Sequence, residues 1–246
     1  MEQRAAYNLT DYGRYQALAV LGGQVHAQGR FWQAVSRQFL SPAGPGVWVA
    51  DGGLDFCLAE GLSPQAVLGD MDSLSPQASL WLASAACPVR RYPRRKDQTD
   101  GALALEALCS ELPEASRILI LAGWGEERQD HHYLHLQLLF QLRQRGYWPV
   151  LSNGRNWALP LCGACQVSLP PAEKQAYLVS LIAQGGSLGP LESRGLAYEL
   201  GGRSLDWGDS LGLSNYPQSG APAVELRSAG GLGLLICSED EGSFCY

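Results

Sequence analysis

The sequence of 246 residues predicts an α/β fold, with a parallel-sheet α/β domain over residues 1–155 followed by an all-β sandwich over residues 156–246. Two observations lead to this prediction. In the first two-thirds of the chain, short apolar runs alternate with helical patterns, which is typical of a parallel sheet covered by helices. Beyond about residue 155 the helical periodicity fades, and short alternating runs are separated by clusters of glycine, serine, proline and asparagine.

The N-terminal part is expected to hold strands and helices in alternation. In chain order, the strand candidates are residues 15–21, 47–50, 66–68, 88–92, 118–122 and 148–151, and the helix candidates are residues 31–40, 57–61, 102–109 and 133–145. Thr99 or Asp100 is suited to cap the alanine- and leucine-rich helix that follows. Because ligands bind beyond the carboxyl ends of parallel strands, we expect the charged loops there to converge on one edge of the sheet.

The C-terminal part is expected to consist of short strands. The candidates are residues 166–169, 176–182, 196–200, 224–226 and 232–236. Glycine pairs such as Gly185-Gly186 lie between them and are typical of hairpin turns. Cys162 and Cys165 form a single CxxC motif with no second pair at zinc-ligand spacing, so we interpret it as part of a turn and not as a metal or redox site.

Composition and charge exclude several classes of protein. The chain is 46% hydrophobic and 17% charged, which is a globular balance with a sizeable core. Its net charge of -6 argues against nucleic acid as a partner. The N-terminus leads into no apolar signal-peptide region, and no run approaches the length of a membrane span. The seven cysteines are odd in number and scattered, so we expect a cytoplasmic protein with no membrane partner.

Two acidic clusters indicate metal and phosphate chemistry. Asp70 and Asp72 flank one residue, so in an extended loop both side chains would point the same way and reach one cation. Carboxylate and phosphate oxygens are the ligands that Mg²⁺ prefers, and nearby lysine and arginine suit a polyphosphate. The DxD pair alone is equally consistent with an acidic exposed turn, and glycosyltransferases and phosphatases share it.

The second cluster, Lys96 to Asp100, sharpens this interpretation. Lys96 can neutralise phosphate oxygens, and Asp97 or Asp100 can supply a further metal ligand or accept a proton. The alternative is a helix N-terminus, where threonine and aspartate cap the helix and favour its dipole. Both interpretations can hold together, because a helix N-terminus also binds phosphate.

Further candidates follow two other strands. Arg128 is suited to bidentate contact with phosphate, whereas Asp130 is either a ligand contact or the N-cap of the next helix. Three histidines, at 131, 132 and 135, invite a metal interpretation, but no HExxH-like arrangement supports zinc. Asp51 precedes Gly52 and Gly53, which permit either close approach of the backbone to a ligand or a tight turn. No Walker A or GxGxxG motif is present.

Taken together, these motifs resemble those of the thiamine pyrophosphokinase family. In the order of that family, the motifs are Ala50-Asp51-Gly52-Gly53, Gly69-Asp70-Met71-Asp72-Ser73, Lys96-Asp97-Gln98-Thr99-Asp100, Arg128-Gln129-Asp130-His131, Ser193-Arg194-Gly195-Leu196-Ala197-Tyr198 and Leu213-Ser214-Asn215. Each motif is weak alone, whereas several in order are specific. The resemblance extends from about residue 15 to the end of the chain.

The resemblance implies an ATP- and Mg²⁺-binding catalytic domain, a thiamine-binding β-sandwich and a homodimer with active sites shared between subunits. The reaction it implies moves the pyrophosphoryl group of ATP to the hydroxyethyl oxygen of thiamine, giving thiamine diphosphate and AMP. Such a transfer needs charge neutralisation and alignment more than covalent chemistry, so carboxylates with arginine and lysine suffice.

The resemblance also implies residue roles. Asp70, Asp72 and Asp100 would hold Mg²⁺. The expected nucleotide contacts are Asp51, Gly52, Arg128, Asp130 and His131. The catalytic candidates are Lys96, Asp97 and Asp100, with one of the two aspartates as proton acceptor. The thiamine pocket is expected to hold Ser214 and Asn215, an aromatic face from Tyr198 or Tyr216, and Lys96 or Gln98 of the partner subunit.

Two departures from the family pattern concern nucleotide binding. Glu126 and Glu127 stand in a loop that is usually richer in glycine, and His135 stands where the family commonly has asparagine. Two alternative functions stay open. One is a pyrophosphokinase that acts on another alcohol, and the other is a non-catalytic regulatory protein that binds thiamine or nucleotide. A sugar-nucleotide transferase is disfavoured, because it leaves the second acidic cluster and the β domain unexplained.

Overall fold

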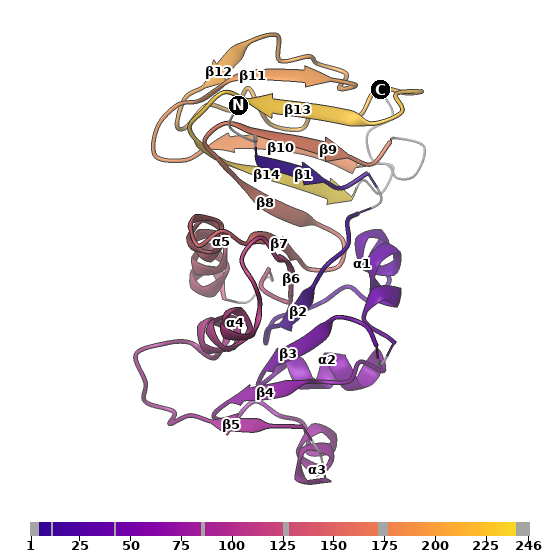
Figure 1. The fold of residues 1–246 in the computed structure, drawn as a ribbon, viewed down its shortest axis with the longest axis vertical. Helices are drawn as coiled ribbons and strands as arrows, with labels where there is room; N and C mark the ends of the chain where they lie inside the picture. Colours follow the sequence, from indigo (N-terminus) through magenta and orange to yellow (C-terminus); the bar gives the residue numbers. More distant parts are fainter. Residues whose placement is uncertain are drawn as a thin grey trace. The chain divides into compact units, whose positions relative to one another are not determined.

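The computed structural model describes residues 5–10, 12–41, 43–84, 87–124, 128–171 and 177–239. The chain forms two compact units (Figure 1). The α/β unit comprises Arg14–Gln28 and Val35–Gly154, and the β unit comprises Met1–Gly13, Gly29–Ala34 and Arg155–Tyr246. Two short N-terminal segments therefore group with the C-terminal residues, and the domain boundary after residue 155 stays a prediction.

The α/β unit is built on a parallel sheet with the strand order β7-β6-β2-β3-β4-β5. Its strands are β2 (Ala17–Val20), β3 (Gly46–Ala50), β4 (Ala66–Gly69), β5 (Val89–Arg91), β6 (Arg117–Leu121) and β7 (Trp148–Ser152). Every residue of β2 and β4 is buried, as expected for parallel strands covered on both faces. This explains why these strands appear in the sequence as continuous apolar runs and not as alternating ones.

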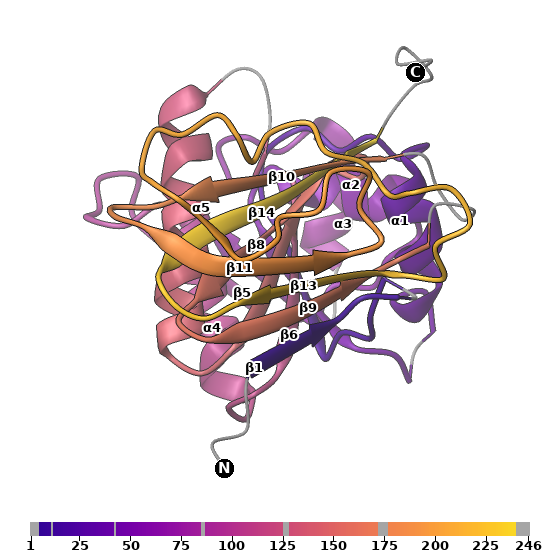
Figure 2. The ribbon, with the colours of Figure 1, turned by 90° about the horizontal axis from the view of Figure 1, so that it is seen from above.

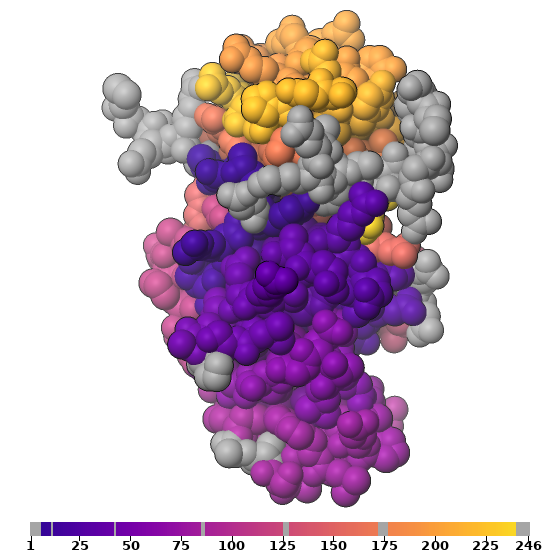
Figure 3. Space-filling model, turned by 90° about the vertical axis from the view of Figure 1, so that its right-hand side faces the viewer, coloured from indigo at the N-terminus to yellow at the C-terminus, as the bar shows by residue number. Residues whose placement is uncertain are grey.

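Helices cover both faces of this sheet. The helical segments are α1 (Arg30–Val35), the 3₁₀ turn η1 (Ser36–Gln38), α2 (Gly53–Ala59), α3 (Pro76–Ser84), α4 (Asp100–Glu111) and α5 (Gln129–Gln144). The chain proceeds from β2 to β5 in one direction and then returns to β6 and β7. Right-handed crossovers therefore place α2 and α3 on one face and α4 and α5 on the other (Figure 1). Figure 3 shows one outer surface of the α/β unit in space-filling form, coloured from indigo to magenta along the sequence.

The register of the parallel strands brings their carboxyl ends to one edge of the sheet. Val20 of β2 is paired with Leu121 of β6 and with Val49 of β3, and Ala50 is paired with Leu68 of β4. The loops that follow these strands therefore start side by side. The predicted convergence of the charged loops is confirmed within the α/β unit.

Helix starts are set by local residues. Thr99 is the N-cap of α4, because its Oγ1 accepts a hydrogen bond from the backbone N–H of Ala102 at 3.2 Å. Helix α5 begins at Gln129, earlier than expected, with Arg128 at the N-cap position. Asp130 lies in the first turn, so its interpretation as the N-cap was wrong.

The β unit contains two sheets. One has the order β1-β9-β13-β11-β12, and the other joins β10, β14 and β8 as antiparallel neighbours. The strands are β1 (Ala5–Asn8), β8 (Trp157–Cys162), β9 (Cys165–Leu169), β10 (Tyr177–Ala183), β11 (Leu188–Arg194), β12 (Arg203–Leu205), β13 (Val224–Ser228) and β14 (Leu232–Glu239). Figure 2 shows the strands of both sheets from above. Burial alternates along β9 and β10, so each sheet buries one face.

The two sheets of the β unit pack face to face. A methyl group built on Gly233 of β14 would lie 2.6 Å from Cδ2 of Leu188, which belongs to β11 in the other sheet. The contact leaves no room for a side chain at Gly233. The predicted fold class, a parallel-sheet α/β domain with a C-terminal β-sandwich, is confirmed.

Several elements differ from the expectations. β1, α3, β8, β11 and β12 were not predicted, and residues 196–200 form no strand but make one isolated bridge between Leu196 and Pro217. Cys162 and Cys165 flank the β8–β9 turn, where Gly163 has a φ of 65°, as the turn interpretation requires. Among the described cysteines there is no disulfide, and Cys245 lies outside the described residues. No helix in the described ranges is long and apolar enough to cross a membrane.

Gly53 marks a close approach between helix α2 and the end of β2. A methyl group on Gly53 would lie 2.6 Å from the carbonyl oxygen of Val20 and 2.7 Å from that of Leu21. Gly186, in contrast, has open space around its Cα and no left-handed φ. We therefore expect Gly53→Ala to lower the free energy of unfolding by about 1–3 kcal/mol and Gly186→Ala to change it by less than about 0.5 kcal/mol. Urea denaturation of both variants checks this, and equal stabilities would contradict the backbone contact.

Candidate active site

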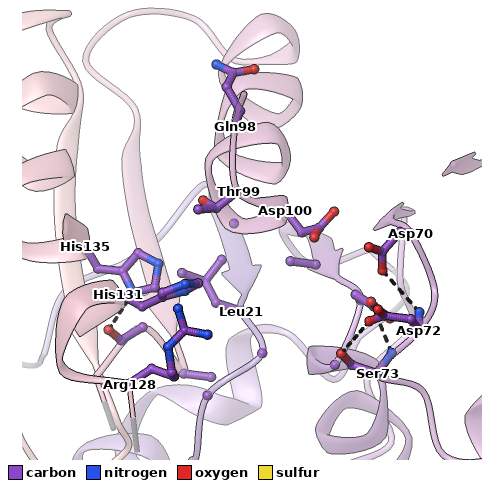
Figure 4. Close-up of a pocket in the computed structure, with 18 of the residues that line it drawn as sticks. Leu21, Asp70, Asp72, Ser73, Gln98, Thr99, Asp100, Arg128, His131 and His135 are labelled. Carbon is purple, nitrogen blue, oxygen red and sulfur yellow. Dashed lines mark hydrogen bonds between the residues drawn. The ribbon is translucent and has the colours of Figure 1, made fainter. Parts of the chain in front are cut away.

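A cavity of about 720 Å³ opens at the carboxyl edge of the parallel sheet in the α/β unit. It lies where the strand order reverses, between β2 and β6, which is where open α/β sheets bind ligands. Residues from five loops line it, among them Gly22, Gly52 and Gly123 and the side chains shown in Figure 4. The backbones of two glycines nearly touch here, since a methyl group on Gly52 would lie 3.5 Å from Cα of Gly22.

Three carboxylates meet on one side of this cavity. Asp51 follows β3, and Asp70 and Asp72 follow β4. One oxygen of each lies within 4.8 Å of the others. The sequence placed Asp51 with the nucleotide contacts, whereas the structure groups it with the two residues of the DxD pair. The neighbouring positions of β3 and β4 in the sheet cause this grouping, whereas the alternation of strands with helices predicts only that the two loops lie at the same edge.

The loop after β4 is held by hydrogen bonds from its own backbone. Oδ1 of Asp70 accepts from the N–H of Asp72 at 3.2 Å, and the N–H of Ser73 donates to Oδ2 of Asp51 at 3.4 Å. Oγ of Ser73 donates to Oδ1 of Asp72 at 3.0 Å (Figure 4). Met71 adopts a φ of 65°, so the loop turns sharply between the two aspartates. These bonds fix the carboxylates that face the cavity.

Gly69 is the point around which the acidic segments converge. It has a φ of 147°, and a methyl group there would lie 2.8 Å from Cβ of Asp51 and 3.1 Å from Oδ1 of Asp100. Only glycine combines this backbone conformation with such close neighbours. The start of the DxD motif therefore has glycine for a steric reason.

The carboxyl group of Asp51 lies in an unfavourable environment for a charge. Its side chain is buried, with 5% of the residue exposed, and its Oδ1 has no hydrogen-bond partner among the described residues. The pKa of Asp51 is raised to about 6, chiefly by burial and also by its interaction with Asp70 and the charge of Asp100, while the hydrogen bond from the N–H of Ser73 lowers it. For Asp70, the N–H of Asp72 and the charge of Lys96 hold the pKa below its usual range.

Two cations from the loop before α4 face these carboxylates. Nζ of Lys96 lies 2.9 Å from Oδ1 of Asp100 and 3.9 Å from Oδ2 of Asp70. Nε of Arg94 lies 3.2 Å from Oδ2 of Asp72. The site therefore holds opposite charges close together, and Asp100 is neutralised by Lys96 from within the chain.

The acidic cluster fits a hard divalent cation. It offers oxygens from three carboxylates, including the buried Oδ1 of Asp51, for which the described part of the chain provides no hydrogen-bond partner. A cation there would relieve the repulsion among the three groups. Histidines do not contribute: among the described residues, the grouping that could hold a metal consists of Asp51, Asp70 and Asp72 alone.

The opposite side of the cavity is formed by the β6–α5 region. Arg128 lines the cavity and makes two bonds to Asp130, from Nε at 3.0 Å and from Nη2 at 2.8 Å. This guanidinium holds the pKa of Asp130 well below its usual range. Asp130 itself does not line the cavity, whereas His131 does. Glu126 and Glu127 lie outside the described residues.

His135 is largely buried and also lines the cavity. Its Nδ1 lies 2.8 Å from the carbonyl oxygen of Gly123, and its ring meets that of His131 edge-on. Burial lowers the pKa of His135, so the neutral ring donates to this carbonyl near neutral pH. The histidine that departs from the family pattern thus fixes the end of β6.

The remaining residues of the segment Lys96 to Asp100 differ in whether they line the cavity. Thr99 and Gln98 line the cavity, but Nε2 of Gln98 donates to Oε2 of Glu106 at 3.4 Å (Figure 4). Asp97 is exposed and does not line the cavity. Of the two candidate proton acceptors, the structure therefore brings Asp100 to the site.

The expected thiamine residues gather in the β unit. Nδ2 of Asn215 donates to the carbonyl oxygen of Tyr198 at 2.7 Å, and Oδ1 accepts from the N–H of Tyr198 at 3.2 Å and of Tyr216 at 2.9 Å. The two tyrosine rings meet edge-on with centroids 5.9 Å apart. Ser214 is exposed, and its N–H donates to Oγ of Ser180 at 3.1 Å. The amide of Asn215 is thus used to hold the two tyrosine segments together.

Comparisons with known proteins agree with the motifs. Residues 44–149 match the family model described as thiamin pyrophosphokinase, catalytic domain. A curated relative named thiamine pyrophosphokinase, from Bacillus subtilis (strain 168), is 26% identical over 170 residues, which cover 69% of this chain and 77% of that protein.

Solved structures share the fold. The crystal structure of thiamine pyrophosphokinase from Bacillus subtilis has a TM-score of 0.76 at 22% identity, covering 91% of this chain and 99% of that one. The thiamin pyrophosphokinase from Candida albicans has a TM-score of 0.73 at 15% identity, covering 96% and 93%. The resemblance to the thiamine pyrophosphokinase family is confirmed.

Because the pKa of Asp51 is raised, we expect the stability of the protein to depend on pH when divalent cations are absent. The folded state holds the Asp51 proton more tightly than the unfolded chain, so this stabilisation is complete below about pH 4 and is lost as pH rises through about 6. Asp51→Asn cannot ionise, and we expect it to be more stable than wild type by about 1–3 kcal/mol at pH 7.5.

Thermal unfolding in a chelator, at pH 4 and at pH 7.5, measures this difference. The advantage of Asp51→Asn is expected to be largely gone at pH 4. A variant that is less stable than wild type at pH 7.5 would show that the carboxylate is not strained by its surroundings.

Proposed function

We propose that this chain is a Mg²⁺-dependent thiamine diphosphokinase, which transfers the pyrophosphoryl group of ATP to the hydroxyethyl oxygen of thiamine and forms thiamine diphosphate and AMP. The observation that carries the proposal is the cavity at the sheet edge, where three carboxylates face Lys96 and Arg94 from one side and Arg128 from the other. This cavity lies largely within the residues that match the catalytic-domain model.

The proposed reaction is a displacement at the β-phosphorus of ATP. The hydroxyethyl oxygen of thiamine forms a bond to the β-phosphorus. The bond between the β-phosphorus and the oxygen that bridges the α- and β-phosphates breaks, and AMP leaves with the electron pair of that bond. Mg²⁺, when bound, neutralises phosphate charge in the transition state. Lys96 and Arg128 add positive charge on the two sides of the cavity.

The hydroxyl proton must pass to a base as the new bond forms. Asp100 faces the cavity, whereas Asp97 is exposed outside it, so Asp100 is the better placed of the two proposed acceptors. Its Oδ1 lies 2.9 Å from Nζ of Lys96, and this ion pair holds the carboxylate at the cavity.

For the metal, we propose Asp70, Asp72 and Asp100 as ligands, and the geometry adds Asp51 as a fourth acidic neighbour. For the nucleotide, we propose Arg128, Asp130, His131 and the Asp51-Gly52 turn. Supporting this, the glycines at the cavity floor allow phosphate groups to approach the backbone. ATP is thus proposed to enter between the acidic cluster and Arg128.

For thiamine, we propose the group of Tyr198, Ser214, Asn215 and Tyr216, together with Lys96 or Gln98 of the partner subunit in a homodimer. Thiamine carries a positive charge on its thiazolium ring, and an aromatic face attracts such a cation. Tyr198 is 64% exposed, which leaves its ring available to a ligand.

The decisive assay measures AMP and thiamine diphosphate with and without Mg²⁺. We expect both products from wild type with thiamine, and an activity about 100-fold lower in Asp72→Asn, because a metal ligand is lost. Asp206→Asn removes the same charge from an exposed loop of the β unit and should keep full activity. AMP formed only with another alcohol would support a different pyrophosphokinase, and binding without turnover would support a regulatory protein.

The aromatic contribution is tested at Tyr198. We expect Tyr198→Ala to raise the KM for thiamine about tenfold, since a desolvated cation–π contact contributes roughly 0.5–2 kcal/mol, while leaving thermal stability unchanged. Trp207→Ala is the matched control, because Trp207 is an equally exposed aromatic of the same unit, with 74% exposed. Equal KM values in the two variants would remove Tyr198 from the thiamine site.

A further inference from the structure

The segment before helix α4 is unusually basic. Residues 90–96 contain Arg90, Arg91, Arg94, Arg95 and Lys96, in a chain whose net charge is -6. Arg94 and Lys96 line the cavity, and Arg95 between them does not. Alternate residues of this segment therefore face the acidic cluster.

The two cavity cations are held in different ways. The Lys96 side chain is 14% exposed and contacts both Asp70 and Asp100, so it is fixed inside the site. The Arg94 side chain is 84% exposed and has one ion pair, from its Nε to Oδ2 of Asp72. An exposed single pair of this kind contributes at most about 1 kcal/mol, so Arg94 can leave its partner at little cost.

We propose that Arg94 is an exchangeable counter-ion: it neutralises Asp72 while the acidic cluster holds no cation, and a divalent cation that binds Asp72 releases the guanidinium to contact the polyphosphate of the nucleotide. This inference rests on the proposed function and adds a positioning residue to it. Arg94 is not part of the motifs on which the resemblance depends.

Competition for one carboxylate carries the first half of the exchange. A cation bound by the cluster draws on the same carboxylate that Arg94 contacts, because Asp72 contributes to the group of three. Two positive groups at one carboxylate repel each other, so binding of the ion weakens the hold on Arg94. Lys96 is held more firmly than Arg94, since it contacts two carboxylates, Asp70 and Asp100, and its side chain is only 14% exposed.

The chemistry of the guanidinium carries the second half. A planar guanidinium binds phosphate through two parallel hydrogen bonds, which a lysine cannot do. Arg94 already lines the cavity, so its long side chain can turn toward a bound phosphate group without a movement of the backbone. Arg128 lines the same cavity, and the two arginines would bind the polyphosphate together. The exchange thus gives Asp72 a positive partner before ligand binding and gives the bound polyphosphate a further positive group afterwards.

The test compares Arg94→Gln with Arg95→Gln by calorimetry, without thiamine. Each variant loses one positive charge from the same loop, so any long-range effect of net charge is common to both. Relative to Arg95→Gln, we expect Arg94→Gln to bind Mg²⁺ about two- to five-fold more tightly in the absence of nucleotide. At saturating Mg²⁺, we expect it to bind ATP about tenfold more weakly.

Opposite shifts of the two affinities are the signature of the exchange. Equal affinities in the two variants would overturn it, as would weaker Mg²⁺ binding in Arg94→Gln, which would mean that Arg94 only orients Asp72. A change in Mg²⁺ affinity with unchanged ATP affinity would also overturn it, because the released group then has no role. Wild type that shows both bindings but forms no thiamine diphosphate would refute the proposed function and leave the exchange intact.

Discussion

Repulsion among like charges is the constraint on which the α/β unit depends. Asp51, Asp70 and Asp72 are held within a few ångströms of one another, with one carboxyl oxygen buried and unsatisfied. Folding tolerates this because the cost is distributed: Lys96 and Arg94 supply charge, and backbone N–H groups supply hydrogen bonds. The arrangement lowers the stability of the folded state, and it is suited to a ligand that brings its own positive charge.

The parallel sheet makes this concentration of charge possible. The buried side chains of its strands are apolar except for Ser152 at the end of β7, and their register delivers every following loop to the same edge. Gly69 then lets these loops approach more closely than a residue with a side chain could. Fold and site are therefore linked through backbone geometry more than through any single side-chain contact.

Local patterns predicted the α/β unit well, since its buried strands and capped helices have strong sequence signals. Thr99 before the helix and the apolar run ending at Leu121 are examples. Long-range pairing was not predictable. β1 lies far from its partner in sequence, and β11 contains Gly189 and Pro190, which resemble turn residues. The proximity of Asp51 to the DxD pair likewise depends on which strands become neighbours, and spacing along the chain does not encode that.

The pairing of β1 has a consequence for the order of folding. Ala5 is paired with Cys165, so β1 is synthesised well before its neighbour, which follows only after the residues of the α/β unit. Contacts of such sequence separation form slowly, because a long loop must close before they are gained. The α/β unit can meanwhile fold on the shorter connections between its own strands. The β unit, and with it the edge strand contributed by the N-terminus, is therefore the part of the molecule that is completed last.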